Sequence, residues 1–141
     1  MSGVYARLRQ QTDVQFLKTA WELQAELVRF LMSEKNMPKK WRYMLGQDII
    51  HKVLEFVDNL NYANCLYPTN RDEYLKRLDY QNQAIANIWQ LQNKIVLMID
   101  SIDTVKVEKL SKVIELLDSS ETLVKGWKKS DKERYKKLLA V

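Results

Sequence analysis

The sequence predicts an all-α protein, namely an antiparallel up-down-up-down four-helix bundle followed by a short basic C-terminal helix or tail. Apolar residues recur at steps of three and four over four long segments, which is the period of an amphipathic helix. Only three glycines and two prolines occur in 141 residues, which leaves few places for the turns of a strand-rich fold. Short connections between long helices make neighbouring helices antiparallel.

The first helix is expected over residues 12–35. Thr12 and Gln15 form a capping-box pattern, in which each side chain satisfies a free backbone group at the helix start. The apolar positions that follow are Phe16, Ala20, Leu23, Leu27 and Phe30.

A second helix is expected over residues 40–67, between Pro38 and Pro68. Each proline disfavours helical geometry in the residue before it, so both prolines mark helix boundaries. The core-facing positions of this helix are Leu45, Ile49, Val53, Phe56, Leu60, Ala63 and Tyr67.

The third helix is expected over residues 70–101, starting at the capping-box pattern Asn70-Arg-Asp-Glu73. Its length is about 45 Å at 1.5 Å per residue, which suits a bundle. Its core-facing positions are Leu75, Leu78, Ile85, Ile88, Ile95, Met98 and Ile102.

The fourth helix is expected over residues 104–126, with Leu110, Val113, Leu117 and Val124 facing the core. We expect it to end at Gly126, because glycine commonly terminates helices. The bundle domain would then cover residues 1–130, and residues 131–141 would form a basic tail. Ser130 and Glu133 offer one more capping box, so a short helix over residues 131–139 is the alternative to a tail.

The positive charge of the chain lies at its C-terminal end. Residues 125–141 hold seven of the 23 basic residues and two of the 18 acidic residues, a local charge of +5 that equals the net charge of the whole chain. An anionic partner responds to such local density within a Debye length of about 8–10 Å. The basic residues of this C-terminal cluster are Lys125, Lys128, Lys129, Lys132, Arg134, Lys136 and Lys137.

A second basic cluster surrounds Pro38. It contains Lys35, Lys39, Lys40 and Arg42, interleaved with Trp41 and Tyr43, and in an antiparallel bundle it should lie far from the C-terminal cluster. Cations next to aromatic rings suit nucleic acid, since Lys and Arg neutralise phosphates and rings stack on unpaired bases. Lysine-rich helix ends also favour the helix dipole and solubility without binding anything.

A third basic patch is predicted at the start of the third helix, from Arg71, Lys76 and Arg77, with acidic residues interspersed. The tryptophans Trp41, Trp89 and Trp127 are predicted to act as packing or interface anchors, because large aromatic side chains contribute much of the buried area at such positions.

The chain contains few residues that are suited to catalysis. Asp48-Ile-Ile-His51 resembles one half of a di-iron site, but such sites need the pair twice and His51 is the only histidine. His51 and Cys65, the only cysteine, are fourteen residues apart on one predicted helix, or about 21 Å, which is too far for a catalytic pair within one subunit. We therefore expect no enzyme, no metal and no cofactor.

The setting is expected to be cytoplasmic. The single cysteine excludes an internal disulfide framework, and the longest apolar run, Ile95 to Ile99, is far too short to cross a bilayer. We expect no membrane association.

Three short motifs resemble a known family. They are Pro38-Lys-Lys-Trp-Arg-Tyr-Met-Leu45-Gly46-Gln47, the mid-helix Trp89, and Leu123-Val-Lys-Gly126-Trp127-Lys128-Lys129. They resemble the four-helix-bundle proteins that include the accessory variability determinant (Avd) of diversity-generating retroelements and proteins encoded in intervening sequences of ribosomal RNA genes. Relatives often carry arginines near the helix-three tryptophan, where this chain has Asn87, Gln90 and Gln92.

The resemblance implies a non-enzymatic accessory protein that binds RNA or DNA and a reverse transcriptase and supports mutagenic synthesis of complementary DNA. It also implies a homopentamer. The alternative expectation is a helical-bundle adaptor that binds partner proteins through its aromatic surface and has no role with nucleic acid.

Overall fold

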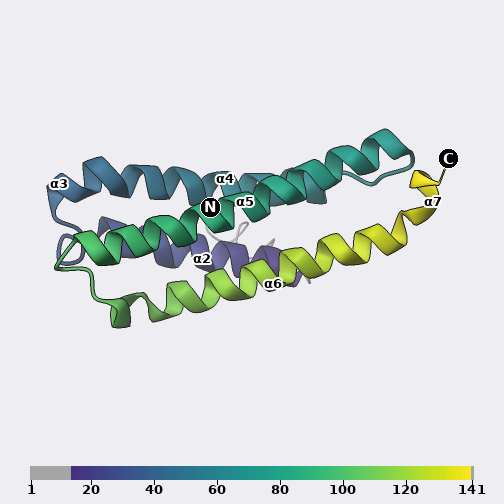
Figure 1. Ribbon diagram of the computed structural model, residues 1–141. Helices are drawn as coiled ribbons and strands as arrows, with labels where there is room; N and C mark the ends of the chain where they lie inside the picture. Colours follow the sequence, from purple (N-terminus) through teal and green to yellow (C-terminus); the bar gives the residue numbers. More distant parts are fainter. Residues whose placement is uncertain (1–13, 141) are drawn as a thin grey trace, which may run out of the picture.

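The computed structural model describes residues 14–140, and none of these residues lies in a β-strand. Four long helices dominate the structure (Figure 1). They are α2 (Gln15–Met32), α4 (Gln47–Asn64), α5 (Arg71–Ser101) and α6 (Ser111–Arg134). The all-helical class predicted from the sequence is therefore confirmed.

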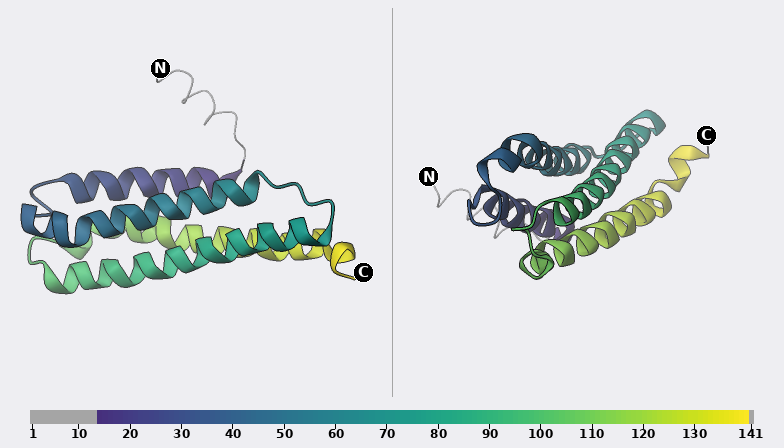
Figure 2. Two further views of the ribbon diagram at one scale, coloured as in Figure 1. Left: turned by 90° about the horizontal axis from the view of Figure 1, so that it is seen from above. Right: turned by 60° about the vertical axis from the view of Figure 1, so that its left-hand side comes forward.

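The four long helices enclose one apolar core. The contacting pairs are α2 with α4, α4 with α5, α5 with α6, and α6 with α2, so each helix has two neighbours. Successive long helices run in opposite directions (Figures 1 and 2). This arrangement is compatible with the predicted four-helix bundle.

Apolar periodicity located the core correctly over most of each helix. Leu23, Val53, Ile88 and Val124, one from each long helix, are all fully buried. Tyr67 was predicted to face the core but lies after the end of α4 and is 79% exposed. The predicted core position Leu75 is also exposed.

The second helical segment is continuous but not uniform. α3 (Lys39–Trp41) begins after Pro38, as predicted, and passes through the π-helical turn η1 (Arg42–Gly46) into α4. π-Helical turns within α-helices are uncommon. The helix ends at Asn64, three residues before the predicted boundary.

The predicted cap of α5 is present. The Asn70 side chain accepts a hydrogen bond from the Glu73 backbone N–H at 2.9 Å. The Glu73 carboxylate accepts in return from the Thr69 backbone N–H at 3.0 Å and from its hydroxyl at 2.6 Å. The hydrogen bonds from Thr69 lower the pKa of Glu73. The predicted cap of the first helix involves Thr12, which lies outside the described residues.

The fourth long helix differs most from its prediction. It begins with the 3₁₀ turn η2 (Val107–Leu110) and then runs without interruption through Gly126 to Arg134, eight residues past the predicted end. The expected end of this helix at Gly126 is therefore wrong, and α6 runs across residue 130, where we expected a tail to begin. Only α7 (Lys136–Leu139) is a separate C-terminal helix.

Tertiary contacts explain why α6 continues past Gly126. Glycine inside a helix costs about 1 kcal/mol relative to alanine, which other contacts can offset. Just beyond it, the Trp127 ring stacks on the Phe16 ring of α2, with centroids 3.9 Å apart. One turn later, the buried Asp131 pairs with Arg77 of α5. Both contacts require the helix to continue.

The long helices do not all have the same extent. The first half of α5 and the last half of α6 lie side by side and reach beyond the start of α2, toward α7 (Figures 1 and 2). α3 lies at the opposite end of the molecule (Figure 1). The described part of the chain contains no helix with the length and apolar character needed to cross a membrane.

Candidate functional site

A groove of about 670 Å³ lies where α5 and α6 extend together toward the C-terminal end. Its cationic residues all come from α6 and its aromatic and aliphatic residues mainly from α5. The cationic residues are Lys125, Lys128, Lys129 and Lys132. The apolar residues are Tyr74, Leu78, Ile85, Trp89 and Leu139 of α7, and Asn82 completes the described lining.

Helical periodicity places the lysines together. Positions 125, 128, 129 and 132 follow the i, i+3, i+4, i+7 pattern, so these four side chains share one face of α6. Val124 and Asp131 lie on another face, and both are buried. The helix therefore directs its lysines to the groove and the nearby acid Asp131 to the interior.

Asp131, Arg77 and Gln81 form a buried hydrogen-bonded ion-pair network, which we call the clasp. The Asp131 carboxylate accepts from Arg77 Nε at 2.7 Å and Nη2 at 3.0 Å, and from Gln81 Nε2 at 2.7 Å. The remaining Arg77 nitrogen, Nη1, donates to the Leu66 carbonyl at 2.8 Å in the α4–α5 connection. The clasp therefore joins α5, α6 and that connection. Burial raises the pKa of Tyr74, and the negative charge of Asp131 adds to this effect.

Arg77 does not belong to an exposed basic patch, contrary to the sequence prediction. It is only 5% exposed, and its guanidinium lies 4.9 Å from the Trp127 ring centroid and 5.7 Å from the Tyr135 ring centroid. Of the predicted third patch, Arg71 and Lys76 are exposed.

The predicted tryptophan anchors have different environments. Trp127 packs inside, against Phe16 and Arg77. Trp41 packs against the edge of the core. Trp89 is half exposed at the groove, where its ring centroid lies 5.6 Å from Lys125 Nζ.

Glu121 of α6 fixes the position of Trp89. One carboxylate oxygen accepts from the indole Nε1 at 3.0 Å and from Lys125 Nζ at 2.7 Å. The other oxygen accepts from Gln92 Nε2 at 3.0 Å. Hydrogen bonds from Lys125, Trp89 and Gln92 lower the pKa of Glu121 to about 2, so the carboxylate is charged at neutral pH.

The other predicted basic residues lie outside the groove. Arg134, Lys136 and Lys137 are exposed but do not line it. Lys39, Lys40 and Arg42 are at the opposite end, as predicted (Figure 1). There, Lys39 and Arg42 line a smaller hollow of about 260 Å³, and Arg42 Nη2 lies 3.7 Å from the exposed Glu34 carboxylate.

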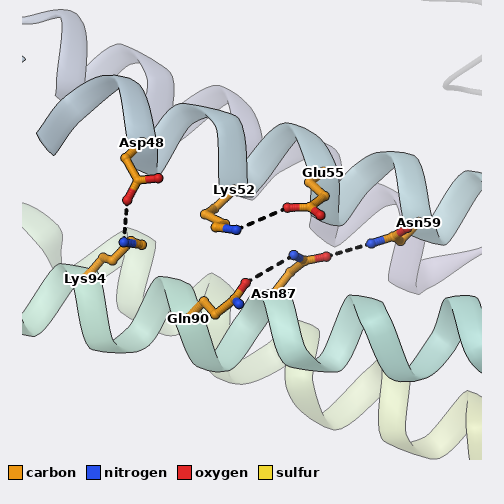
Figure 3. Close-up of polar contacts among 7 residues, drawn as sticks. All are labelled: Asp48, Lys52, Glu55, Asn59, Asn87, Gln90 and Lys94. Atoms are coloured by element: carbon orange, nitrogen blue, oxygen red, sulfur yellow. Dashed lines mark hydrogen bonds and ion pairs between the residues drawn. The ribbon is translucent and has the colours of Figure 1, made fainter. Parts of the chain in front are cut away.

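Sequence reasoning missed a polar seam between α4 and α5 (Figure 3). Buried Asn59 donates to Asn87 Oδ1 at 2.8 Å, and Asn87 donates to Gln90 at 3.4 Å. Farther along the seam, Lys94 of α5 pairs with Asp48 of α4 and lowers its pKa. Asn59 and Asn87 fall on the core-facing stripes of their helices, which is the sequence signal for a buried polar pair. Such pairs favour one register between helices.

The residues considered for catalysis remain apart from the groove. His51 and Cys65 are both exposed and neither lines it. Among residues 14–140, no group of three or more His, Cys, Asp and Glu side chains has a metal-binding arrangement. The groove itself offers lysine ammonium groups, an indole ring and aliphatic surface, which together suit the binding of an anion with apolar parts.

Comparison with known proteins gives no match. No protein-family model matches the chain, and no curated protein and no solved structure is significantly similar to it. The functional proposal therefore starts from the groove and from the sequence motifs.

Proposed function

We propose that this protein is a non-enzymatic nucleic-acid-binding protein that holds RNA or DNA in the groove between α5 and α6. The observation that carries the proposal is the set of four lysines on one face of α6 along the groove, of which Lys128, Lys129 and Lys132 form no ion pair with a described residue. Lysines in such a row neutralise successive phosphates and release the counterions bound to them, which supplies most of the affinity of sequence-independent binding.

The buried clasp supports the same proposal. An exposed carboxylate at position 131 would lie within one turn of Lys128, Lys129 and Lys132 and would weaken their attraction for phosphates. Pairing with Arg77 instead places Asp131 in the interior, where it is 1% exposed. The acid that remains next to the groove is Glu121, which pairs with Lys125, whereas Lys128, Lys129 and Lys132 form no ion pair with a described residue.

The biological setting that we propose comes from the sequence motifs. The segments around Trp41, Trp89 and Trp127 resemble the Avd family, so the protein would act in the cytoplasm as an accessory subunit of a diversity-generating retroelement. It would bind a reverse transcriptase, form an antiparallel four-helix bundle, and assemble as a homopentamer. Light scattering tests the assembly, since five copies of the 16.8 kDa chain are readily distinguished from one.

Triple replacement of groove lysines tests nucleic-acid binding. We expect K128Q/K129Q/K132Q to lower the affinity for a fluorescent 12-nucleotide RNA at least tenfold. We also expect it to reduce the slope of log affinity against log salt by about 2, because each single-strand phosphate contact contributes about 0.7. Fluorescence anisotropy between about 50 and 200 mM salt measures both quantities.

The matched control is K106Q/K109Q/K112Q, which removes the same charge from exposed positions around η2 and at the start of α6, far along the helix from the groove lysines. We expect it to change the affinity less than threefold. Equal losses in the two variants would mean that net charge, and not the groove, governs binding. Truncation after Gly126 is unsuitable because it also deletes Trp127 and Asp131, which hold the fold together.

The second candidate function is a protein-binding adaptor. The specific observation in its favour is the adjacent pair Val96 and Leu97 on α5, which are 57% and 51% exposed. Apolar side chains exposed side by side are typical of contact surfaces for proteins. An interface of this kind would bind its partner with an affinity nearly independent of salt, in contrast to the groove.

A further inference from the structure

We infer that the groove selects single-stranded nucleic acid, with unpaired bases held against its apolar side and phosphates along its lysines. This inference rests on the proposed function and specifies the substrate class. It starts from the two-sided composition of the groove, with lysines from α6 facing aromatic and aliphatic residues from α5.

A duplex would leave half of the groove unused. Its bases are paired and stacked inside the double helix, so only phosphates and sugars would reach the lysine row. The apolar side, which includes Leu78, Ile85 and Trp89, would gain no partner. Unpaired bases expose aromatic faces that stack on such side chains, with little dependence on base identity.

The dimensions suit a few nucleotides. From Lys125 to Lys132, α6 rises about 10 Å at 1.5 Å per residue. That distance corresponds to about three stacked nucleotides at about 3.4 Å along one strand. The groove volume of about 670 Å³ is several times the ~150 Å³ of an apolar cavity that binds benzene, so it has room for more than one base.

Trp89 is the residue best placed to stack on a base. The residue is 50% exposed, and the edge of its ring is fixed by the hydrogen bond from Nε1 to Glu121. A ring that is already oriented loses little conformational freedom on binding. Lys125, bound to the same carboxylate, lies 5.6 Å from the ring centroid. Glu121 is therefore a positioning residue for both side chains.

The test compares a 12-nucleotide oligouridylate, a 12-nucleotide oligothymidylate and a 12-base-pair DNA duplex by fluorescence anisotropy with the full chain. We expect both single strands to bind at least tenfold more tightly than the duplex. Trp89→Ala should weaken single-strand binding about tenfold and duplex binding less than twofold, and Trp89→Phe should restore most of the loss because a ring remains.

The matched control is Leu97→Ala, which shortens another half-exposed apolar side chain of α5 that does not line the groove. It should leave all affinities unchanged, and circular dichroism should report the same helix content for every variant. Poly-glutamate of equal charge should compete at least tenfold less well than oligouridylate.

Four outcomes separate the inference from the proposed function. Equal binding of duplex and single strand would overturn the inference while leaving nucleic-acid binding in place. Equal loss on both substrates in Trp89→Ala, or competition by poly-glutamate as effective as by oligouridylate, would also overturn it. Binding of none of the oligonucleotides would overturn both.

Discussion

The two ends of the molecule both carry clusters of basic residues, but they differ in where the neighbouring acidic groups lie. At the α3 end, Arg42 is 3.7 Å from the carboxylate of Glu34, which is itself 85% exposed. At the α7 end, the carboxylate of Asp131 is buried against Arg77, and the lysines of α6 lie in a row in which Lys125 pairs with Glu121. A basic cluster therefore gains local positive charge when the fold moves one of its acids, here Asp131, into the interior.

The ends also differ in how the cations are spaced. A regular α-helix carries the four groove lysines, so their side chains share one face. The cations after Pro38 lie on the short helix α3 and on the π-helical turn η1, and Lys40 does not line the hollow that Lys39 and Arg42 share. The C-terminal cluster thus has the more regular arrangement for a polyanion.

Removing the buried acid should have the largest effect on stability. We expect Asp131→Ala to lower the free energy of unfolding by about 3–5 kcal/mol, because it leaves the buried Arg77 cation without a counter-ion. Glu34→Ala at the other end should cost less than about 1 kcal/mol, since its ion pair is long and exposed. Urea unfolding followed by circular dichroism measures both. If both substitutions lowered the free energy of unfolding by a similar small amount, the clasp would be accessible to water and the two ion pairs would not differ in strength.

Gly126 offers a sharper test of the uninterrupted α6. We expect Gly126→Ala to raise the free energy of unfolding by about 0.5–1 kcal/mol, because alanine favours the helix and a Cβ there meets no atom within 4 Å. If Gly126 instead ended the helix in the left-handed conformation, the same substitution would lower the free energy of unfolding. The matched substitution at the other end is Gly46→Ala, whose methyl would meet Arg42 and Met37 at an ordinary 3.8 Å. Destabilisation by Gly126→Ala alone would contradict the continuous helix.

Lowering the pH should remove a smaller contribution to the free energy of unfolding, which comes from Glu121 beside the groove. The pKa of Glu121 is lowered from 4.5 to about 2 in the folded protein, so the unfolded state binds more protons between these values. The resulting stability is present above about pH 4.5 and is lost as the pH falls toward 2. Because the network is partly exposed, we expect about 1 kcal/mol or less.

Urea unfolding of the wild type and Glu121→Gln at pH 6, 4 and 2 measures this contribution. The difference between the two proteins should be largest at pH 6 and should shrink toward pH 2. A constant difference over that range would show that the Glu121 charge contributes nothing to stability.

Apolar periodicity, prolines and capping residues predicted the helices because all three are local properties of the sequence. Steps of three and four identified core residues such as Leu23 and Ile88, and Asn70 marked the start of α5 within one residue. The predicted end of α6 was wrong because the contacts that decide it are not local. Gly126 is a local stop signal, whereas the contacts that override it involve Phe16 and Arg77, which are distant in the sequence.

The candidate site was predictable only in part. The lysines of residues 125–132 were identified by charge, but their common groove depends on which part of α5 packs beside them. The sequence placed Arg77 with the exposed cations because nothing near it in the chain indicates a partner 54 residues away. Glu121 was missed for the same reason, since its bonds to Trp89 and Gln92 join different helices.

The sequence by itself determined the all-helical class, the approximate limits of four long helices and the concentration of positive charge at the C-terminal end. These features follow from residue spacing and composition, which act over a few turns of chain. Only the tertiary structure decided that α6 continues to Arg134, that Asp131 is buried on Arg77, and that the lysines border an apolar groove. Those outcomes depend on the packing of helices that are distant in the sequence, because burial and ion pairing are set by the partner as much as by the residue itself.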